Sequence, residues 1–312
     1  QKVKGSLAVI LPWIFFYLSA ASDPGYISQF NHHDQMALYP YDFSIFYPGQ
    51  TCRTCYFLKP ARSKHCSICK RCISKFDHHC IFINNCVGYR NHHFFILLIS
   101  TTALLTVYAT YVGLSLLSAS IQKELPIWTF YGKGYTWTQY GNILAWAFNK
   151  HLRIGAITLL CLLSSPLVLG LLVYHLYLIW AGTTTNETLK WSDLRSDMAD
   201  GYAFQRSLPI DRQKNERYES LSVQWPCESE HIITRSYDGR PPNPIIIGIG
   251  EWKRVWKLDD IRNLYDLGFM KNLQDIFWPR CPNRRVDHMK TSCSLPTLDS
   301  NLTKRDVPIN LK

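Results

Sequence analysis

Three long stretches of the chain are almost entirely apolar and carry no charged side chain. They cover residues 5–22, 94–122 and 154–186. Apolar runs of about 18 residues or more are long enough to cross the hydrocarbon core of a bilayer as a helix. A buried helix of a soluble core is the alternative for any one run, but three runs in one chain favour membrane spans. The pattern predicts an all-α polytopic membrane protein with transmembrane helices at 1–22, 94–122 and 154–182.

The charged residues between these stretches predict an orientation. Lysine and arginine outnumber aspartate and glutamate in residues 22–93, and lysine and arginine are abundant again after residue 187, whereas residues 123–153 are rich in aromatic side chains instead. Basic loops remain on the cytosolic side and aromatic residues gather at membrane interfaces. We therefore expect residues 23–93 and 183–312 in the cytosol and residues 123–153 in a lumenal loop. Lys2 and Lys4 oppose this orientation, because three spans leave them on the lumenal side.

The first residue of the chain is glutamine rather than methionine. This suggests that an upstream segment is missing, and one further span there would bring the total to four and place both termini in the cytosol. A cleaved signal peptide is the alternative for residues 1–22. It is disfavoured because the residues that follow do not resemble a mature secreted domain.

Seven of the eleven cysteines lie between residues 52 and 86. An odd number, in a segment predicted to face the reducing cytosol, argues against a disulfide framework. Two Cys-x2-Cys pairs in this segment are typical of zinc binding, and a closed zinc site takes four ligands. Two sites need eight ligands, which six cysteines and two histidines supply with one cysteine left over. Counting does not identify that cysteine, but Cys80 is the best candidate because it lies outside both pairs and follows Asp77, His78 and His79.

A spare cysteine next to a histidine and a carboxylate suggests nucleophilic catalysis. Such a cysteine needs a base within hydrogen-bond reach and a group that orients the base, and His78 and Asp77 have these chemical properties. Neighbouring lysine and arginine side chains would favour the Cys80 thiolate. The alternative is that Asp77 orients a zinc-bound histidine and that none of the three residues is catalytic. The spacing alone leaves both interpretations open.

Two other classes of protein share parts of this pattern. A membrane-anchored zinc adaptor, such as a ubiquitin-ligase-like protein or a nucleic-acid-binding finger, would need the metal ligands but no spare cysteine. A zinc hydrolase or deaminase needs a three-ligand site with a nearby glutamate, and residues 22–93 contain no glutamate. The spare cysteine beside Asp77 and His78 favours an enzyme over an adaptor.

The motifs resemble those of a known family. The run from Cys52 to Phe95, with Asp-His-His-Cys at 77–80, resembles the DHHC cysteine-rich domain of the protein S-acyltransferases, or palmitoyltransferases. Asp-Pro-Gly at 23–25, Thr-Thr-Asn-Glu at 184–187 and the segment 263–277 are similar to further motifs of that family, and the pattern is closest to its fungal endoplasmic-reticulum branch. The resemblance divides the chain into a linker at 23–50, a zinc-stapled irregular or β-hairpin domain at 51–93, and a C-terminal region at 183–312.

The resemblance implies a role for each motif residue. Two structural Zn²⁺ ions are expected, one on Cys52, Cys55, His65 and Cys72, and the other on Cys66, Cys69, His79 and Cys86. Cys80 would accept the acyl group, with His78 as its base and Asp77 orienting that base. Thr185 is expected near Asp77, and Asn272 is expected to brace the C-terminal region. One departure is that Ile81 and Phe82 replace the Pro-Trp that follows the DHHC cysteine in many members, which alters the apolar wall beside Cys80.

The implied reaction is transfer of a fatty acyl group from acyl-CoA, such as palmitoyl-CoA, to cysteines of membrane-associated proteins. Lys59, Arg62 and Lys64 are candidate contacts for the CoA phosphates, or they face anionic lipid. The expected partners are the bilayer and proteins with juxtamembrane cysteines, and no nucleic acid is expected. We expect an integral membrane protein of the endoplasmic reticulum or Golgi with a cytosolic active site. A membrane-anchored zinc-binding adaptor or ubiquitin-ligase-like protein is the alternative.

Overall fold

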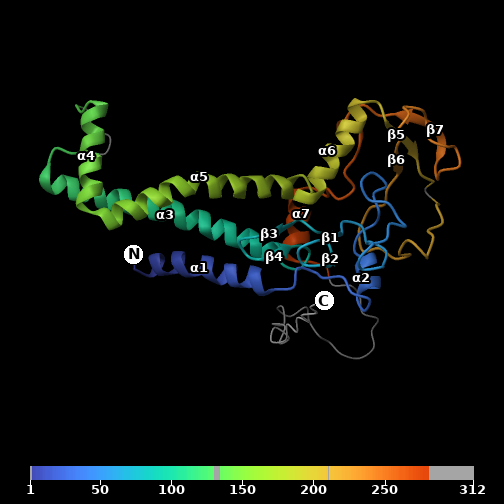
Figure 1. Ribbon diagram of the computed structural model, residues 1–312, viewed down its shortest axis with the longest axis horizontal. Helices are drawn as coiled ribbons and strands as arrows, with labels where there is room; N and C mark the ends of the chain where they lie inside the picture. Colours follow the sequence, from blue (N-terminus) through green and yellow to red (C-terminus); the bar gives the residue numbers. More distant parts are fainter. Residues whose placement is uncertain (1, 130–133, 210, 281–312) are drawn as a thin grey trace, which may run out of the picture. The chain divides into compact units, whose positions relative to one another are not determined.

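The computed structural model describes residues 2–129, 134–209 and 211–280 (Figure 1). The chain divides into two compact units. The helical unit comprises the described residues of 1–16 and 94–176, and the cysteine-rich unit comprises those of 17–93 and 177–312. The parts of the predicted C-terminal region and lumenal loop that fall at 281–312 and 130–133 lie outside the described residues.

Long apolar helices make up the helical unit. Helix α3 (His92–Glu124) and helix α5 (Leu152–Trp180) are long and apolar enough to cross a membrane. Helix α1 (Lys2–Ala21) also forms, but its apolar stretch is only Gly5–Ala21. Two of the three predicted spans are therefore long and apolar enough to cross a membrane. Large apolar side chains remain exposed along α5, where Leu167 is 75% exposed. Exposed apolar surface of this extent requires an apolar environment or a partner.

Small residues allow α3 and α5 to approach each other closely within the helical unit. A Cβ atom added to Gly113 of α3 would lie 2.0 Å from Oγ1 of Thr158 in α5. The Thr158 hydroxyl donates to the Ile154 carbonyl at 2.7 Å, so its polar atom is satisfied inside its own helix. Close contacts of this kind, built from glycine and hydroxyl residues, are typical of helices that pack in lipid.

The predicted loop at 123–153 contains a helix, α4 (Trp137–Lys150), so its description as a loop was incomplete. The side chain of Thr136 accepts from the Gln139 N–H at 3.3 Å, and the Gln139 side chain accepts from the Thr136 N–H at 3.0 Å. This reciprocal capping box starts the helix. Tyr140 and Ala147 then pack against Trp128 of the preceding turn. The aromatic richness of the segment reflects this packing as well as any interfacial position.

Two short β-hairpins carry the cysteine-rich motif. Strands β1 (Lys64–Cys66) and β2 (Arg71–Ile73) form the first, and strands β3 (His78–Cys80) and β4 (Asn85–Val87) form the second, both antiparallel. The expectation of a β-hairpin cysteine-rich region is met in these strands. Each hairpin pairs a histidine with a cysteine, His65 with Cys72 and His79 with Cys86.

The C-terminal region contributes a third sheet, which the all-α description leaves out. Strands β5 (Ala203–Ser207), β6 (His231–Arg235) and β7 (Ile249–Arg254) form an antiparallel sheet in the order β6-β5-β7. The all-α description was therefore too narrow, and the described chain has mixed helix and strand content. The remaining elements are α2 (His32–Met36), α6 (Thr185–Ala199), a 3₁₀ turn η1 (Leu258–Asp260) and α7 (Phe269–Phe277).

The predicted linker at 23–50 is part of the core of the cysteine-rich unit. Tyr39, Tyr41 and Phe43 are buried there and pack with residues of the C-terminal region, including Tyr265. The buried carboxylate of Asp42 accepts the backbone N–H groups of Ser44, Ile45 and Phe46 at 2.8–3.1 Å, which fixes the tight turn of this segment. The linker therefore joins the two cysteine-rich hairpins to the C-terminal region rather than merely connecting two domains.

Gly182, two residues after the end of α5, occupies a position that only glycine tolerates. Its φ is +62°, and an added Cβ would lie 2.5 Å from the Cα of Asp266. Gly182→Ala is expected to destabilise the protein by about 2 kcal/mol or more, because the left-handed backbone and the clash add together. The measurement is the thermal unfolding midpoint of the purified protein. Gly170→Ala is the matched control, because Gly170 lies inside α5 with open space around its Cα; equal midpoints for the two variants would contradict the prediction.

Candidate active site and metal centres

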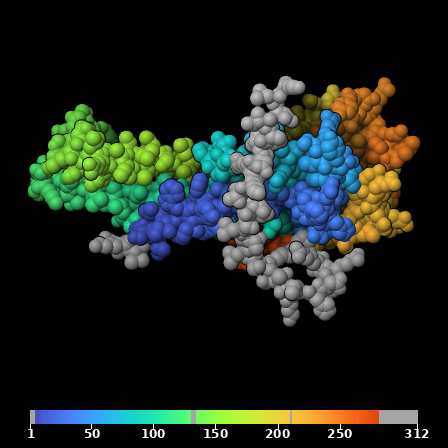
Figure 2. Space-filling view, turned by 60° about the horizontal axis from the view of Figure 1, so that its bottom comes forward, coloured from blue at the N-terminus to red at the C-terminus, as the bar shows by residue number. Residues whose placement is uncertain are grey.

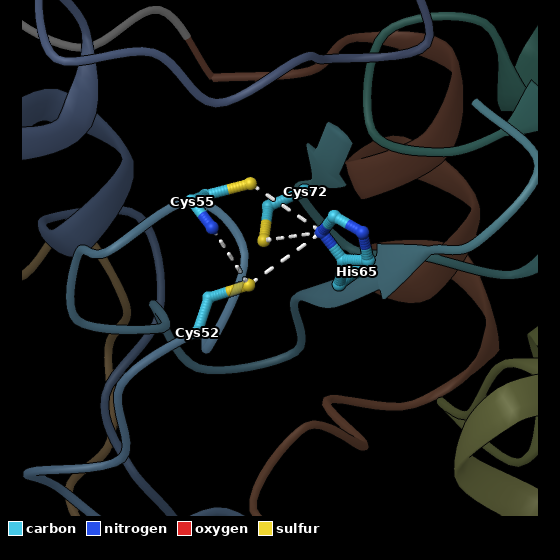
Figure 3. A group of neighbouring side chains, drawn as sticks. All are labelled: Cys52, Cys55, His65 and Cys72. Carbon is cyan, nitrogen blue, oxygen red and sulfur yellow. Dashed lines mark hydrogen bonds between the residues drawn. The ribbon is translucent and has the colours of Figure 1, made fainter. Parts of the chain in front are cut away.

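The first group of metal-ligand side chains brings together Cys52, Cys55, His65 and Cys72 (Figure 3). The Nδ1 atom of His65 lies 3.5 Å from the Cys52 sulfur, 3.4 Å from the Cys55 sulfur and 3.7 Å from the Cys72 sulfur. The Cys55 N–H also points at the Cys52 sulfur, at 3.4 Å. Figure 3 shows the three sulfurs turned toward the Nδ1 atom of the imidazole ring, around a common centre.

The second group repeats this arrangement with Cys66, Cys69, His79 and Cys86. The Nδ1 atom of His79 lies 3.7, 3.4 and 3.4 Å from the sulfurs of Cys66, Cys69 and Cys86, respectively. The Cys69 and Cys86 sulfurs are 3.5 Å apart. Both groups are thus built from three thiols and one imidazole.

These distances fit a tetrahedral metal ion. Zinc bonds of about 2.3 Å to sulfur and about 2.0 Å to nitrogen place neighbouring ligand atoms of a tetrahedron about 3.5–3.8 Å apart. The observed separations of 3.4–3.7 Å match that spacing in both groups. Each group can therefore hold a metal ion with four protein ligands and no open position. Such an ion would supply structural cross-linking rather than a site for a reactive water.

Strand alternation explains how two interleaved sets of ligands avoid each other. His65 and Cys66 are adjacent in β1, yet His65 belongs to the first group and Cys66 to the second. Successive side chains of a strand point to opposite faces. The same alternation in β3 sends His79 to the second metal group and leaves His78 on the other face, outside both groups.

Cys80 is the one cysteine of residues 52–86 that belongs to neither metal group. It ends β3 opposite Asn85 and its side chain is buried. The Asn85 amide donates to the carbonyls of Ser19 and Ser22, at 3.1 and 2.8 Å, which ties this hairpin to the C-terminal end of α1. Asn85 was not recognised in the sequence, where it has no motif of its own.

Asp77, His78 and Cys80 lie together as a hydrogen-bonded set. The His78 Nδ1 atom and the Asp77 Oδ2 atom are 2.6 Å apart, and Asp77 is fully buried. Cys80 forms a side-chain hydrogen bond with His78. The arrangement is acid, imidazole and thiol, in which the acid holds the imidazole in one orientation.

The hydrogen bonds of this set shift its pKa values toward an ion pair. Burial alone would lower the pKa of His78, but the bonds and charges of Asp77 and Cys80 raise it to about 9. Burial alone would raise the pKa of the Cys80 thiol, but the His78 bond and the N–H groups of Ile83 and Phe82 lower it below its usual value. A thiolate beside an imidazolium is the reactive form of a cysteine nucleophile.

The Thr-Thr-Asn-Glu segment supports this set from the start of α6. Thr185 donates its N–H to Asp77 Oδ1 at 2.8 Å and its hydroxyl to Asp77 Oδ2 at 3.1 Å. Thr184 caps the helix, since its hydroxyl oxygen accepts the Glu187 N–H at 3.3 Å, while its own O–H donates to the Phe76 carbonyl at 3.1 Å. The segment therefore holds Phe76 and Asp77 in place, although it lies more than 100 residues later in the sequence.

Removing the Thr185 hydroxyl is expected to slow acyl-enzyme formation. In Thr185→Val the N–H bond to Asp77 remains and the O–H bond is lost, so Asp77 holds His78 less firmly. The loss of one hydrogen bond to a charged group predicts a fall in rate of about tenfold or more. The measurement is single-turnover labelling with acyl-CoA. Thr188→Val serves as control, because the Thr188 hydroxyl donates to the Thr185 carbonyl at 2.7 Å; similar rates for the two variants would show that Thr185 does not act through Asp77.

Arg62 is not free to bind CoA phosphates, which corrects one of the three candidate contacts. It is buried, and its guanidinium forms a bidentate ion pair with Glu187 at 2.6 Å for both bonds. It also lies over the rings of Tyr39 and Tyr265, 5.0 and 4.4 Å from their centroids. A basic residue in a charged run is usually expected to be exposed. The partner of Arg62 lies 125 residues away in the sequence, so the sequence does not reveal the pair. Lys59 and Lys64 are not buried, so they keep the exposure that an anion contact needs.

Asn272 and Asp275 connect α7 to the rest of the cysteine-rich unit. The Asn272 amide donates to the Ile179 carbonyl at 3.0 Å and to Asp266 Oδ1 at 2.8 Å, and its oxygen accepts the Leu267 N–H at 3.0 Å. Asp275 forms a buried ion pair with Lys75 at 2.7 Å. Lys75 lies two residues before Asp77, so α7 also reaches the segment that carries the candidate acid. The sequence did not predict this ion pair.

Comparison with known proteins places this geometry in one class. The family model described as DHHC palmitoyltransferase matches residues 45–192. "Palmitoyltransferase SWF1" of Neurospora crassa is 47% identical over 294 residues, covering 89% of this chain and 68% of that protein. "Palmitoyltransferase swf1" of Aspergillus fumigatus is 40% identical over 289 residues (86% and 76%), and "Palmitoyltransferase ZDHHC4" of Mus musculus is 33% identical over 180 residues (57% and 52%).

The shared region includes both metal-ligand groups and the Asp77–Cys80 set. The chain belongs to the DHHC palmitoyltransferase family. The resemblance stated from the sequence motifs is thereby confirmed, including its fungal character, since SWF1 palmitoyltransferases of several fungi are among the relatives.

Proposed function

We propose that this protein is a membrane-embedded protein S-palmitoyltransferase that transfers a fatty acyl group from acyl-CoA to cysteine thiols of membrane-associated proteins. The observation that carries the proposal is the Asp77–His78–Cys80 set beside two closed metal-ligand groups. Family membership supports the reaction class. A zinc adaptor would have no use for a spare cysteine whose imidazole neighbour is anchored to a buried carboxylate.

The proposed reaction has two thioester exchanges. In the first, the Cys80 thiolate attacks the carbonyl carbon of the acyl-CoA thioester, the Cys80–acyl bond forms, and the bond to the CoA sulfur breaks. The His78 imidazolium supplies the proton to the departing CoA thiolate. In the second, His78 accepts the proton of a substrate thiol, whose sulfur attacks the acyl carbonyl and releases the Cys80 thiolate. Asp77 keeps its charge and its bond to His78 throughout.

Zinc ions are the proposed occupants of the two metal-ligand groups. When bound, zinc supplies structural cross-links that hold both hairpins. Protein contacts position the reactive side chains. Strand β3 carries His78 and Cys80 and pairs with β4, and Asn85 ties that hairpin to the end of α1. The ligand sets proposed are those that the structure brings together, Cys52, Cys55, His65 and Cys72, and Cys66, Cys69, His79 and Cys86.

We also propose the membrane topology and the organelle of the protein. Helices α3 and α5, together with α1, would span the bilayer, with residues 123–153 on the lumenal side and the cysteine-rich unit in the cytosol. The exposed apolar surface of α5 supports insertion into lipid, and the basic residues of the cysteine-rich segment support the orientation. We place the protein in the endoplasmic reticulum or Golgi, with proteins bearing juxtamembrane cysteines as substrates and Lys59 and Lys64 as contacts for the CoA phosphates.

Turnover with a defined substrate tests the proposed function. The purified protein in lipid nanodiscs is incubated with alkyne-tagged palmitoyl-CoA and a synthetic peptide made of one apolar helix and one flanking cysteine. The expected result is hydroxylamine-labile label first on the protein and then on the peptide. A metal-loaded, folded protein that takes up no label would support the adaptor instead.

A further inference from the structure

A cavity of about 510 Å³ lies in the cysteine-rich unit, and none of the described cysteines lines it. One wall is the segment 36–43, before the zinc-ligand hairpins. The other consists of residues between 207 and 231 of the C-terminal region, excluding residue 210. The two walls are joined by a main-chain hydrogen bond from the Gln224 N–H to the Ala37 carbonyl at 2.8 Å. Just beyond the second wall, the Ile233 N–H donates to the Phe43 carbonyl at 2.8 Å. Figure 2 shows the blue and gold surfaces of these segments adjoining.

The apolar wall of the cavity is aromatic and buried. Tyr39, Tyr41 and Phe43 line it, and each is at least 94% buried in the unit. The Tyr39 hydroxyl donates to Asp275 Oδ2 at 2.7 Å, and the same oxygen accepts from Lys75 at 2.7 Å. Because Lys75 lies two residues before Asp77, this wall is connected by two hydrogen bonds to the segment that carries the candidate active site.

The charged lining of the cavity has a surplus of carboxylates. Three glutamates line it, against one arginine and one lysine, in a chain whose overall charge is +11. Arg212 is bound on both nitrogens by Glu219, at 2.7 and 2.6 Å, and Lys214 pairs with Glu228. Glu230 is exposed at the cavity and forms no ion pair with any described residue. After internal pairing, one negative charge remains for a ligand.

One basic side chain of the protein itself, Arg212, is already bound at the cavity by an aromatic ring and a carboxylate. The Arg212 guanidinium lies over the Phe43 ring, 4.9 Å from its centroid, while Glu219 holds its nitrogens. Aromatic faces with a neighbouring carboxylate attract cations. A volume of this size accommodates one or two side chains of a peptide.

We propose that this cavity is a docking site for a lysine or arginine side chain of the protein substrate, held by Glu230 beside the aromatic wall of Tyr39, Tyr41 and Phe43. This inference rests on the proposed acyltransferase function and specifies its substrate class. Cytosolic segments next to membrane spans are rich in lysine and arginine, so a juxtamembrane cysteine commonly has basic neighbours. A cavity in the same compact unit as Cys80 would select cysteines by those neighbours.

Matched peptides and matched variants test the docking site. The peptides share one apolar helix and one flanking cysteine, followed at a series of spacings by two lysines, two glutamines or two glutamates. The protein is embedded in nanodiscs of zwitterionic phosphatidylcholine, so that anionic lipid does not concentrate the basic peptide. Two quantities are measured for each peptide, the dissociation constant by fluorescence anisotropy without acyl-CoA, and kcat and KM of acyl transfer.

For the wild type we expect KM and the dissociation constant to be about fivefold lower for the lysine peptide than for the glutamine peptide, at one spacing or more and at low salt. Glu230→Gln should remove that preference, leaving kcat and acyl-enzyme formation unchanged, because only uniform binding is lost. Glu230→Lys should shift the preference to the glutamate peptide. Glu251→Gln, an exposed glutamate of β7 that does not line the cavity, should retain the preference for lysine.

Three results would overturn the inference: equal affinities for the lysine and glutamine peptides at every spacing, a preference for the glutamate peptide in the wild type, or an unchanged preference in Glu230→Gln. Because peptide binding is measured without acyl-CoA, the docking site is tested even if the protein forms no acyl-enzyme. Absence of acyl-enzyme in the wild type would refute the proposed function, whereas acyl transfer without a charge preference would refute only the docking site.

Discussion

Replacing Cys80 with serine is expected to abolish acyl-enzyme formation while leaving two metal ions bound per chain. The serine hydroxyl has the same position but is not ionised beside His78, so the rate should fall by on the order of a thousandfold or more. Because Cys80 belongs to neither metal-ligand group, the substitution removes the nucleophile without removing a ligand. The measurements are hydroxylamine-labile labelling with alkyne-tagged palmitoyl-CoA and metal content of the same sample.

Cys227→Ser is the matched control for this prediction. Cys227 is a partly buried thiol of the same unit, outside both metal-ligand groups, so its loss should leave labelling intact. Retained labelling in Cys80→Ser would show that another residue is the nucleophile. Lost metal in Cys80→Ser would show that Cys80 is a ligand, which contradicts the geometry of the two groups.

Removing one ligand from either metal-ligand group is expected to unfold the local hairpin and abolish activity. In His65→Ala the first group loses its imidazole, and the bound metal should fall from two ions to one per chain. Structural zinc in small modules contributes on the order of 10–16 kcal/mol to folding. Even a partial loss of that amount should lower the thermal unfolding midpoint by on the order of 10 °C.

His65→Cys separates metal binding from any other role of the imidazole. Four thiolates also form a closed zinc site, so this variant should keep two metal ions and most of the activity. Thermal unfolding and metal content of His65→Ala, His65→Cys and the wild type are compared in one experiment. An inactive His65→Cys that retained both metal ions would mean that His65 does more than hold the metal.

The eight residues of the two metal-ligand groups were the most predictable part of the site, because their spacing is a local feature of the sequence. The Cys-x2-Cys spacing and the ligand count predict two closed sites and one spare cysteine. The assignment of each ligand to a group came from the family resemblance, and the structure brings together the same two sets. Strand alternation supplies the physical reason, since neighbours such as His65 and Cys66 must point to opposite faces.

The buried ion pairs that support the site were less predictable, because they join residues far apart in the chain. The pairs Arg62–Glu187 and Lys75–Asp275 are both buried, whereas a single sequence offers no sign that a given lysine or arginine is paired rather than solvated. This is why the sequence made Arg62 a candidate contact for the CoA phosphates or for anionic lipid. A buried arginine needs a carboxylate partner, and that need can be recognised only once burial is known.

The two long apolar helices follow from their composition, whereas α4 and the β6-β5-β7 sheet do not. The start of α4 depends on a capping box at Thr136 and Gln139, a signal that the aromatic content of the segment obscures. The sheet joins strands as far apart as Ala203 and Arg254. Pairing over such a distance depends on the core around Tyr265 and Ile233, which local sequence patterns do not reveal.

The most direct test of the account is to locate the acyl group on the protein. The purified, metal-loaded protein is quenched in acid shortly after addition of palmitoyl-CoA, digested, and mapped by mass spectrometry. The account predicts a single hydroxylamine-labile palmitoyl group on Cys80, with the thiols of both metal-ligand groups unmodified. An acyl group on any cysteine of the two metal-ligand groups, with Cys80 unmodified, would contradict it.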